Sequence, residues 1–233
     1  MNRFAYMDQN VAGIRARIRA AEERAGRSGV ELIAAVKYTD AEHIAELKRL
    51  GVCDIGENRV QQLLEHWEAL DRTGLRFHFI GKLQTNKVKY IADKVCMIHS
   101  LDSLRLADEI ERQMAKLGRR MDVLVEINSG AEENKSGISP ADAPEFCARL
   151  VDYPHLNLRG WMTMAPKCEK KEDYRKYFRE TYKLGIDIWE KNIHNIGRPV
   201  FSMGMSDNFE VAIEEGADMV RVGRALFAVP EAT

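Results

Sequence analysis

Lys37 stands at the end of an uninterrupted apolar run, Leu32 to Val36. A run of this length is typical of a strand that is covered on both faces in a parallel sheet. The lysine then lies at the carboxyl end of the strand, the end that carries the chemistry in barrels of alternating strands and helices. Burial disfavours the charged form of an amine, so a partly desolvated Lys37 could attack a carbonyl carbon. The alternative is a lysine whose stem packs while its ammonium group reaches water.

Two later segments have the composition of phosphate-binding loops. One is Ser202-Met203-Gly204-Met205-Ser206, ahead of a helix expected from Asp207, and the other is Arg221-Val222-Gly223-Arg224-Ala225. Small residues let backbone N–H groups approach an anion, and a helix N-terminus favours negative charge. Barrels often bind phosphate with the loops after strands 7 and 8. Each loop alone has a simpler explanation, with Ser206 as a helix cap and Gly223 as a turn residue. Both loops together, opposite a strand-end lysine, favour phosphate.

These features together suit pyridoxal 5′-phosphate (PLP). The amine of Lys37 would form an imine with the aldehyde of this cofactor, and the two loops would hold its phosphate. Arg221 alternates with Val220 and Val222, so its side chain is expected to point into the barrel mouth and meet the pyridine nitrogen. A cation in that position keeps the nitrogen unprotonated and weakens the ring as an electron sink. The alternative for Arg221 is an ion pair with a carboxylate at the barrel mouth.

The rest of the chain alternates between short apolar runs and amphipathic segments. The clearest helix is predicted over residues 102–118, with Asp102 as N-cap and Gly118 after its end, and Ser139-Pro140 predicts another helix start. Residues 4–27 predict an N-terminal helix that covers the barrel near its last strand. The pattern favours one α/β domain over residues 1–233, a (β/α)8 TIM barrel. Its eight strands are predicted over residues 32–37, 54–57, 76–81, 96–100, 121–128, 156–164, 199–204 and 219–223.

Composition and charge restrict the class of protein. The 233 residues are 45% hydrophobic and 30% charged with a formal net charge of −1, which fits a folded core and disfavours nucleic-acid or anionic-membrane partners. The four cysteines lack metal-ligand spacing and the six histidines form no H-E-x-x-H motif, so we predict free thiols and no metal. No signal peptide and no apolar stretch of roughly 18 residues is visible, which predicts a soluble cytoplasmic protein.

Seven short motifs, which follow one another over nearly the whole chain, resemble those of the pyridoxal phosphate homeostasis proteins. That family consists of single-domain relatives of the barrel domain of alanine racemase. The motifs are Ala34-Ala35-Val36-Lys37, Gly56-Glu57-Asn58-Arg59-Val60-Gln61, His78-Phe79-Ile80-Gly81-Lys82-Leu83-Gln84-Thr85-Asn86-Lys87, Asn134-Lys135-Ser136-Gly137-Ile138, Gly160-Trp161-Met162-Thr163-Met164, Ser202-Met203-Gly204-Met205-Ser206 and Arg221-Val222-Gly223.

The resemblance implies roles for individual residues. Lys37 would carry PLP as an internal aldimine, and Arg221 would face the pyridine nitrogen. The phosphate would be held by Ser206, Gly223 and Arg224, and the loop of Ser206 adds Ser202, Met203 and Gly204 to the predicted cofactor site. The ring pocket would be lined by Asn58, His78 and Met162.

Some of these positions have open alternatives. Arg224 stands where the family usually has threonine, and Asn208 where it usually has aspartate, so the usual hydroxyl contact to phosphate is in doubt. Arg224 could still serve the phosphate through its backbone N–H or its guanidinium group. His78 has an alternative role as a hydrogen-bonded histidine of the barrel interior. The lysines of residues 81–89 are either solvated or attract anionic ligands or a partner.

Racemisation needs two acid/base groups, one on each face of the cofactor. Lys37 could serve one face, but in alanine racemase the second base is a tyrosine from a separate C-terminal domain of the partner subunit, and no such domain precedes Thr233 here. Tyr38 is expected to point away from Lys37, because side chains alternate along a strand. We therefore predict a monomeric PLP carrier in vitamin B6 and amino-acid balance, with little turnover and with PLP-dependent apo-enzymes as recipients. The alternatives are a single-domain racemase and a scaffold that has lost the cofactor.

Overall fold

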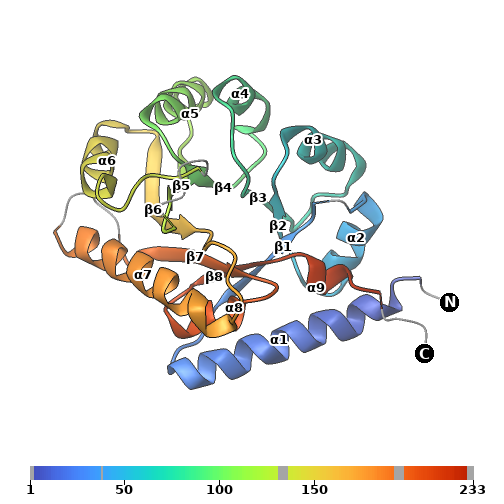
Figure 1. Cartoon of the computed structure of the whole chain (residues 1–233). Helices are drawn as coiled ribbons and strands as arrows, with labels where there is room; N and C mark the ends of the chain where they lie inside the picture. The colour runs from blue at the N-terminus through green and yellow to red at the C-terminus, as the bar shows by residue number, and fades with distance from the viewer. Residues whose placement is uncertain (1–2, 38, 131–135, 192–196, 230–233) are drawn as a thin grey trace.

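Eight parallel strands close into a barrel in the computed structural model, which describes residues 3–37, 39–130, 136–191 and 197–229 (Figure 1). Each strand pairs with the next one along the chain, and the last pairs with the first. The eight predicted strands and the (β/α)8 TIM-barrel fold are thus confirmed. The strands are β1 Glu31–Ala35, β2 Asp54–Glu57, β3 Arg76–Phe79, β4 Met97–Leu101, β5 Met121–Ile127, β6 Leu156–Thr163, β7 Val200–Met205 and β8 Met219–Val222.

Strand β1 ends two residues before Lys37. Val36 still donates its backbone N–H to Gly56 O at 3.1 Å, and the chain then turns, with Thr39 donating to Val36 O from its backbone N–H and from its hydroxyl group. Val36 is buried, whereas Lys37 is exposed. The expectation of a partly desolvated lysine is therefore wrong, because the turn carries Lys37 beyond the end of the sheet. Tyr38, predicted to point away from Lys37, lies outside the described residues.

Helices form the layer around the barrel (Figure 1). Short 3-10 turns at Thr85–Lys87, Leu150–Asp152 and Lys171–Tyr174 adjoin α4, α6 and α7. The helices are α1 Ala5–Ala25, α2 Ala41–Arg49, α3 Val60–Ala69, α4 Val88–Ile91, α5 Leu104–Leu117, α6 Ala143–Arg149, α7 Arg175–Glu190, α8 Phe209–Glu214 and α9 Arg224–Phe227.

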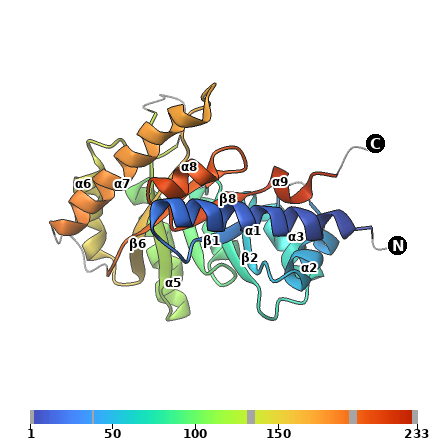
Figure 2. The same ribbon diagram turned by 90° about the horizontal axis from the view of Figure 1, so that it is seen from below.

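The extra N-terminal helix α1 lies along α8 and α9 (Figure 2). The side-chain amide of Asn10 donates to Leu226 O at 3.0 Å and to Ala228 O at 2.9 Å, which ties α1 to the segment after β8. Helix α1 therefore covers the barrel near its last strand, as predicted, since α9 is too short to do so alone. Its buried face consists of Met7, Val11, Ile14, Ile18 and Ala21.

Two predicted helix starts are displaced. Helix α5 is capped by Ser103, whose Oγ accepts from Leu106 N at 3.3 Å, and not by Asp102; Gly118 ends the helix in the left-handed conformation, as predicted. Helix α6 begins only at Ala143, because Ser139 caps a separate turn by accepting from Asp142 N at 3.2 Å.

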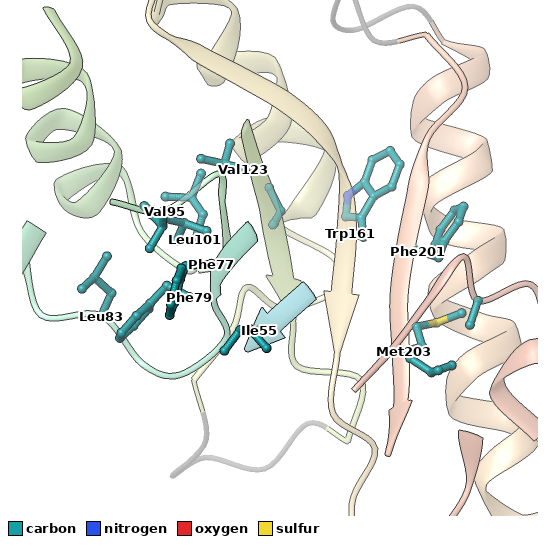
Figure 3. Close-up of a cluster of buried hydrophobic side chains, with 14 of the residues drawn as sticks. Ile55, Phe77, Phe79, Leu83, Val95, Leu101, Val123, Trp161, Phe201 and Met203 are labelled. Carbon is teal, nitrogen blue, oxygen red and sulfur yellow. The ribbon is translucent and has the colours of Figure 1, made fainter. Parts of the chain in front are cut away.

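The main hydrophobic core lies between the strands and the surrounding helices (Figure 3). Trp161 stacks on Phe201 with their ring centroids 5.7 Å apart. Met203, predicted as part of the cofactor loop, is fully buried in this core. Other members from the strands are Ile55, Phe77, Phe79 and Val123.

A smaller apolar cluster fills the inside of the barrel. Met162 follows Trp161 along β6, and alternation along a strand places the two side chains on opposite faces of the sheet. Met162, predicted to line the ring pocket, is completely buried in the inner cluster. The cluster consists of Ile33, Met97, Leu124, Met162 and Met219.

Polar residues complete the inside of the barrel at its amino-terminal end. Asp54 and Arg76 are the first residues of β2 and β3 and form a two-pronged ion pair with both N···O distances at 2.6 Å. The imidazole Nε2 of the buried His78 lies 2.9 Å from Asp54 Oδ1, and Cys96 Sγ lies 3.5 Å from the same nitrogen. His78 is thus a hydrogen-bonded histidine of the barrel interior.

Gly160 allows β6 and β7 to pair closely. Its φ is 148°, and an added Cβ would lie 2.0 Å from Val200 O, a backbone atom that cannot move aside. We predict that Gly160→Ala lowers the free energy of unfolding by at least about 3 kcal/mol, because both the clash and the backbone conformation oppose a side chain. Urea unfolding measures this. In the matched control Gly13→Ala, the added Cβ in α1 meets nothing within 4 Å, and it should stabilise by roughly 0.5–1 kcal/mol. Equal effects of the two substitutions would contradict the proposed role of Gly160.

The charge of His78 makes stability depend on pH. Burial lowers the pKa of this histidine, but its hydrogen bonds with Asp54 and Cys96 outweigh burial and raise the pKa of His78 to about 9. The stabilisation is therefore complete below the unfolded pKa of about 6.5 and is lost as the pH rises to about 9, a loss of about 3 kcal/mol. Urea unfolding across this pH range should show the loss in the wild type. Both His78→Gln and Asp54→Asn should flatten the dependence, and an unchanged slope in both variants would refute the assignment to His78.

Candidate functional site

A cavity of about 360 Å³ opens at the carboxyl ends of the barrel strands. Its walls come from the segments that follow β1, β2, β3 and β6 and from the ends of β7 and β8, so regions distant in sequence meet there. They consist of Ala35, Lys37, Asn58, Ile80, Gly81, Met164, Met205, Ser206, Asp207, Arg221, Gly223 and Arg224.

The structure brings six of the predicted site residues together in this cavity. They are Lys37, Asn58, Ser206, Arg221, Gly223 and Arg224. The other six lining residues were not predicted as site residues. Five of those six, all except Asp207, belong to the motifs quoted above, which is the signal that could have identified them.

Five predicted residues lie away from the cavity walls. Met162 and Met203 belong to the inner and outer cores, and His78 and Ser202 are buried inside the barrel. Gly204 has a φ of 90°, and an added Cβ would lie 2.6 Å from Ala212 Cβ, so its small size serves the packing of α8.

Arg221 is a buried cation at the floor of the cavity. Its Nη1 donates to Ser202 O at 2.6 Å and to Ser202 Oγ at 2.7 Å, and its Nη2 donates to Thr163 O at 2.9 Å. Burial lowers the pKa of Arg221 to about 10, opposed by the charge of Glu126. The group still carries its charge at neutral pH. Among the described residues no carboxylate lies within salt-bridge distance of it, so the ion-pair alternative is not realised there.

Glu126 is the carboxyl group whose charge interacts with that of Arg221. It is buried on β5, and burial, with the charge of Asp102, raises its pKa to about 7, whereas Arg221 and Lys82 act in the opposite direction. Glu126 does not line the cavity.

Ser206 joins the two predicted phosphate loops. Its Oγ accepts from Gly223 N at 3.3 Å and from Ala225 N at 3.4 Å, which leaves the hydroxyl hydrogen available to donate. Ser206 is not the helix cap, because α8 begins at Phe209, two residues later than expected, with Asn208 as its cap residue. Asn208 Oδ1 accepts from Met205 N at 2.7 Å and so holds the turn before α8.

Arg224 forms an exposed ion pair with Asp207 at the edge of the cavity. Both residues also line a second cavity of about 650 Å³, which adjoins the first and shares Met164 and Met205 with it. The lysine-rich segment begins beside the first cavity at Gly81, and Lys87 and Lys89 lie over the exposed ring of Tyr90 at 5.7 and 4.9 Å.

Asn58 supplies an unsatisfied acceptor to the cavity wall. Its Oδ1 is buried and has no hydrogen-bond partner among the described residues. Gly81 packs directly on the backbone of Asn58, and an added Cβ would lie 2.3 Å from Asn58 O. A buried acceptor without a donor is costly unless a ligand supplies one.

The segment that carries Lys37 is held by residues of α3. The ring of His66 lies with Nε2 3.1 Å from Thr39 O and with Nδ1 2.6 Å from Glu57 Oε1, and the side-chain amide of Gln62 donates to Val36 O at 3.3 Å. No sequence pattern indicates this role, since His66 and Gln62 lie on an ordinary amphipathic helix. The motif residues Asn134 and Lys135 lie outside the described residues.

The described part of the chain contains no cluster of three or more potential metal ligands. None of its helices is long and apolar enough to span a bilayer.

The cavity residues fit PLP. They combine an accessible amine, a buried cation, a hydroxyl group with a free hydrogen and an acceptor without a donor.

Comparison with known proteins identifies the family. The family model of the alanine racemase N-terminal domain matches residues 9–230. A pyridoxal phosphate homeostasis protein from Aquifex aeolicus is 46% identical over 213 residues, which cover 91% of this chain and 92% of the relative. The protein of the same name from Escherichia coli K12 is 36% identical, with 97% of each chain covered. PipY of Synechococcus elongatus, solved with PLP bound, has a TM-score of 0.83 and 28% identity and covers 95% of this chain and 100% of its own. The chain therefore belongs to the pyridoxal phosphate homeostasis protein family, which shares the barrel of the alanine racemase N-terminal domain.

Proposed function

We propose that this protein binds PLP in the cavity at the barrel mouth, holds it as a Schiff base on Lys37, and serves PLP homeostasis as a carrier with little or no turnover. The observation that carries the proposal is the meeting of Lys37, Arg221 and the Ser206 and Arg224 loops in one cavity. These groups correspond to three functional groups of PLP, which are its aldehyde, its ring nitrogen and its phosphate. The relatives named for PLP homeostasis and the PLP complex of PipY support it.

The exposure of Lys37 suits a group that must both capture and release an aldehyde. When PLP is bound, the amine of Lys37 would hold its aldehyde carbon as a Schiff base, with the aldehyde oxygen released as water. Because Lys37 is exposed and lines an open cavity, water or another amine has access for the reverse reaction. A carrier needs this access, since it must give up what it binds.

Arg221 explains why turnover would be low. A guanidinium group can only donate hydrogen bonds, so a ring nitrogen that faces it stays unprotonated. When bound, PLP supplies an electron sink for the α-carbon of an amino acid, and an unprotonated ring is weaker in that role.

The cavity also offers Lys37 no evident second base. Among the described lining residues the other ionisable side chains are Asp207, Arg221 and Arg224, and Asp207 is paired with Arg224. Arginine does not act as a base near neutral pH. We further propose that the protein acts in the cytoplasm as a monomer and that PLP-dependent apo-enzymes receive the cofactor.

Incubation with PLP should produce the absorbance of a Schiff base in the wild type and in Lys82→Ala, but not in Lys37→Ala. Lys82 is the matched control because it is exposed and follows Gly81 at the cavity wall. An absorbance that persists in Lys37→Ala would show that another lysine carries the cofactor.

The same samples distinguish the carrier from a racemase. In deuterated buffer with L- and D-amino acids, the carrier should give no deuterium at Cα by mass spectrometry. Lys37-dependent exchange with interconversion of enantiomers would establish the racemase instead. A protein that shows no Schiff-base absorbance with PLP would contradict both the carrier and the racemase.

Arg224→Ala should weaken binding of PLP about fivefold and leave binding of pyridoxal, which lacks the phosphate, unchanged. The factor corresponds to about 1 kcal/mol, the amount expected for an exposed charged contact. Ser206→Ala should show the same selectivity, because it removes a donor and loosens both loops. Titrations of both ligands followed by fluorescence measure these affinities. Equal losses for PLP and pyridoxal would contradict a phosphate contact.

A further inference from the structure

A chain of hydrogen bonds crosses the barrel interior from Arg221 to Asp54. It runs from Arg221 Nη1 to Ser202 Oγ at 2.7 Å, from Ser202 Oγ to His99 Nδ1 at 3.0 Å, and from His99 Nε2 to His78 Nδ1 at 3.0 Å. The last link joins His78 Nε2 to Asp54 Oδ1 at 2.9 Å. All five residues are buried, and they come from β8, β7, β4, β3 and β2. The chain therefore connects the cavity with the opposite end of the barrel.

The hydrogens along this chain follow from its two charged ends. Asp54 can only accept, so His78 donates from Nε2, and the charged form of His78 also donates from Nδ1 to His99. His99 then accepts at Nε2 and carries its own hydrogen on Nδ1, which it donates to Ser202 Oγ. The neutral form of His99 is consistent with burial and with the nearby charges of His78 and Arg221, which lower the pKa of His99 well below its usual value.

Ser202 is the point at which the chain meets Arg221. Its Oγ accepts from both His99 and Arg221, so its own hydrogen must point away from both. If His78 lost its proton, the hydrogen of His99 would move to Nε2 and the hydroxyl group of Ser202 would turn to donate to Nδ1. The chain thus has two self-consistent arrangements that differ by one proton, and they place different hydrogens beside Arg221.

We propose that His99 and His78 are positioning residues for Arg221: the chain orients the acceptor that holds this guanidinium at the cavity and couples occupancy of the cavity to the His78–Asp54 pair. This inference rests on the proposed PLP site for the identity of the occupant. Arg76 and Cys96 lie beside Asp54 and His78, with Glu31 3.9 Å from Arg76, and Glu126 is the carboxylate whose charge acts on Arg221.

The test observes the imidazole nitrogens by NMR in the ¹⁵N-histidine-labelled full chain at neutral pH. In the ligand-free protein, His78 should carry hydrogen on both nitrogens and His99 only on Nδ1. Addition of PLP should shift the signals of His99 and His78 but not those of His43 and His155, which lie outside the barrel. A neutral His78, or His78 and His99 signals that stay fixed while absorbance reports bound PLP, would overturn the inference.

Variants at position 99 distinguish the positioning of Arg221 from the coupling between the cavity and the His78–Asp54 pair. His99→Asn offers an amide N–H to Ser202 but cannot reach His78, whereas His99→Phe keeps a ring without any donor. We expect His99→Phe to weaken PLP binding about tenfold, and His99→Asn to restore most of the affinity while the PLP-induced shift of His78 is lost. Equal affinities of the wild type and His99→Phe would overturn the positioning role.

The failure of the proposed function would look different. If the wild type gives no PLP absorbance, the PLP proposal fails, but Arg221→Lys in the ligand-free protein still tests the chain. It should move the His99 Nδ1 signal and leave those of His43 and His155 in place. An unmoved His99 signal would refute the chain itself. If Arg221→Lys does not fold, the wild-type hydrogen positions at His78 and His99 decide the matter.

Discussion

The burial of one guanidinium group, that of Arg221, is the constraint on which the rest of the site depends. A cation taken out of water is costly unless every donor meets an acceptor. The barrel meets part of this demand with two backbone carbonyls and one serine hydroxyl group, from β6 and β7, which leaves two of the five N–H donors without an acceptor among the described residues. Placing Ser202 there requires a partner for its other side, which is His99, and His99 in turn requires His78. The polar interior is thus the consequence of a charge placed at the cavity floor.

Lys37 occupies the opposite kind of environment. It stands beyond the end of β1 and is exposed, but the segment around it is fixed by His66 and Gln62 on α3. A rigid attachment combined with an accessible amine fits capture and release better than tight sequestration. The Arg224–Asp207 pair is exposed, and a second, larger cavity adjoins the first. Both features leave the barrel mouth accessible to solvent and ligands.

The sequence predicted the barrel well, because strands buried on both faces are continuous apolar runs and each lies between helical segments. It placed Arg221 correctly in the cavity, because alternation with Val220 and Val222 determines the face of the sheet on which its side chain lies. It placed the end of β1 two residues too late, since Lys37 follows Val36 without any turn signal. The cap residues of α5 and α6 were missed because neighbouring polar residues compete for each role. Contacts between segments, such as Ser206 with Gly223 or His99 with Ser202, depend on side-chain directions in three dimensions, which one sequence does not specify.

Chemical trapping tests directly whether Lys37 is the residue that carries PLP. Borohydride reduces a Schiff base to a stable amine, so proteolysis and mass spectrometry of the PLP-treated protein identify the modified lysine. We expect modification confined to Lys37, at one equivalent per chain. Modification of other lysines in preference to Lys37, such as those of residues 82–89 beside the cavity, would contradict it.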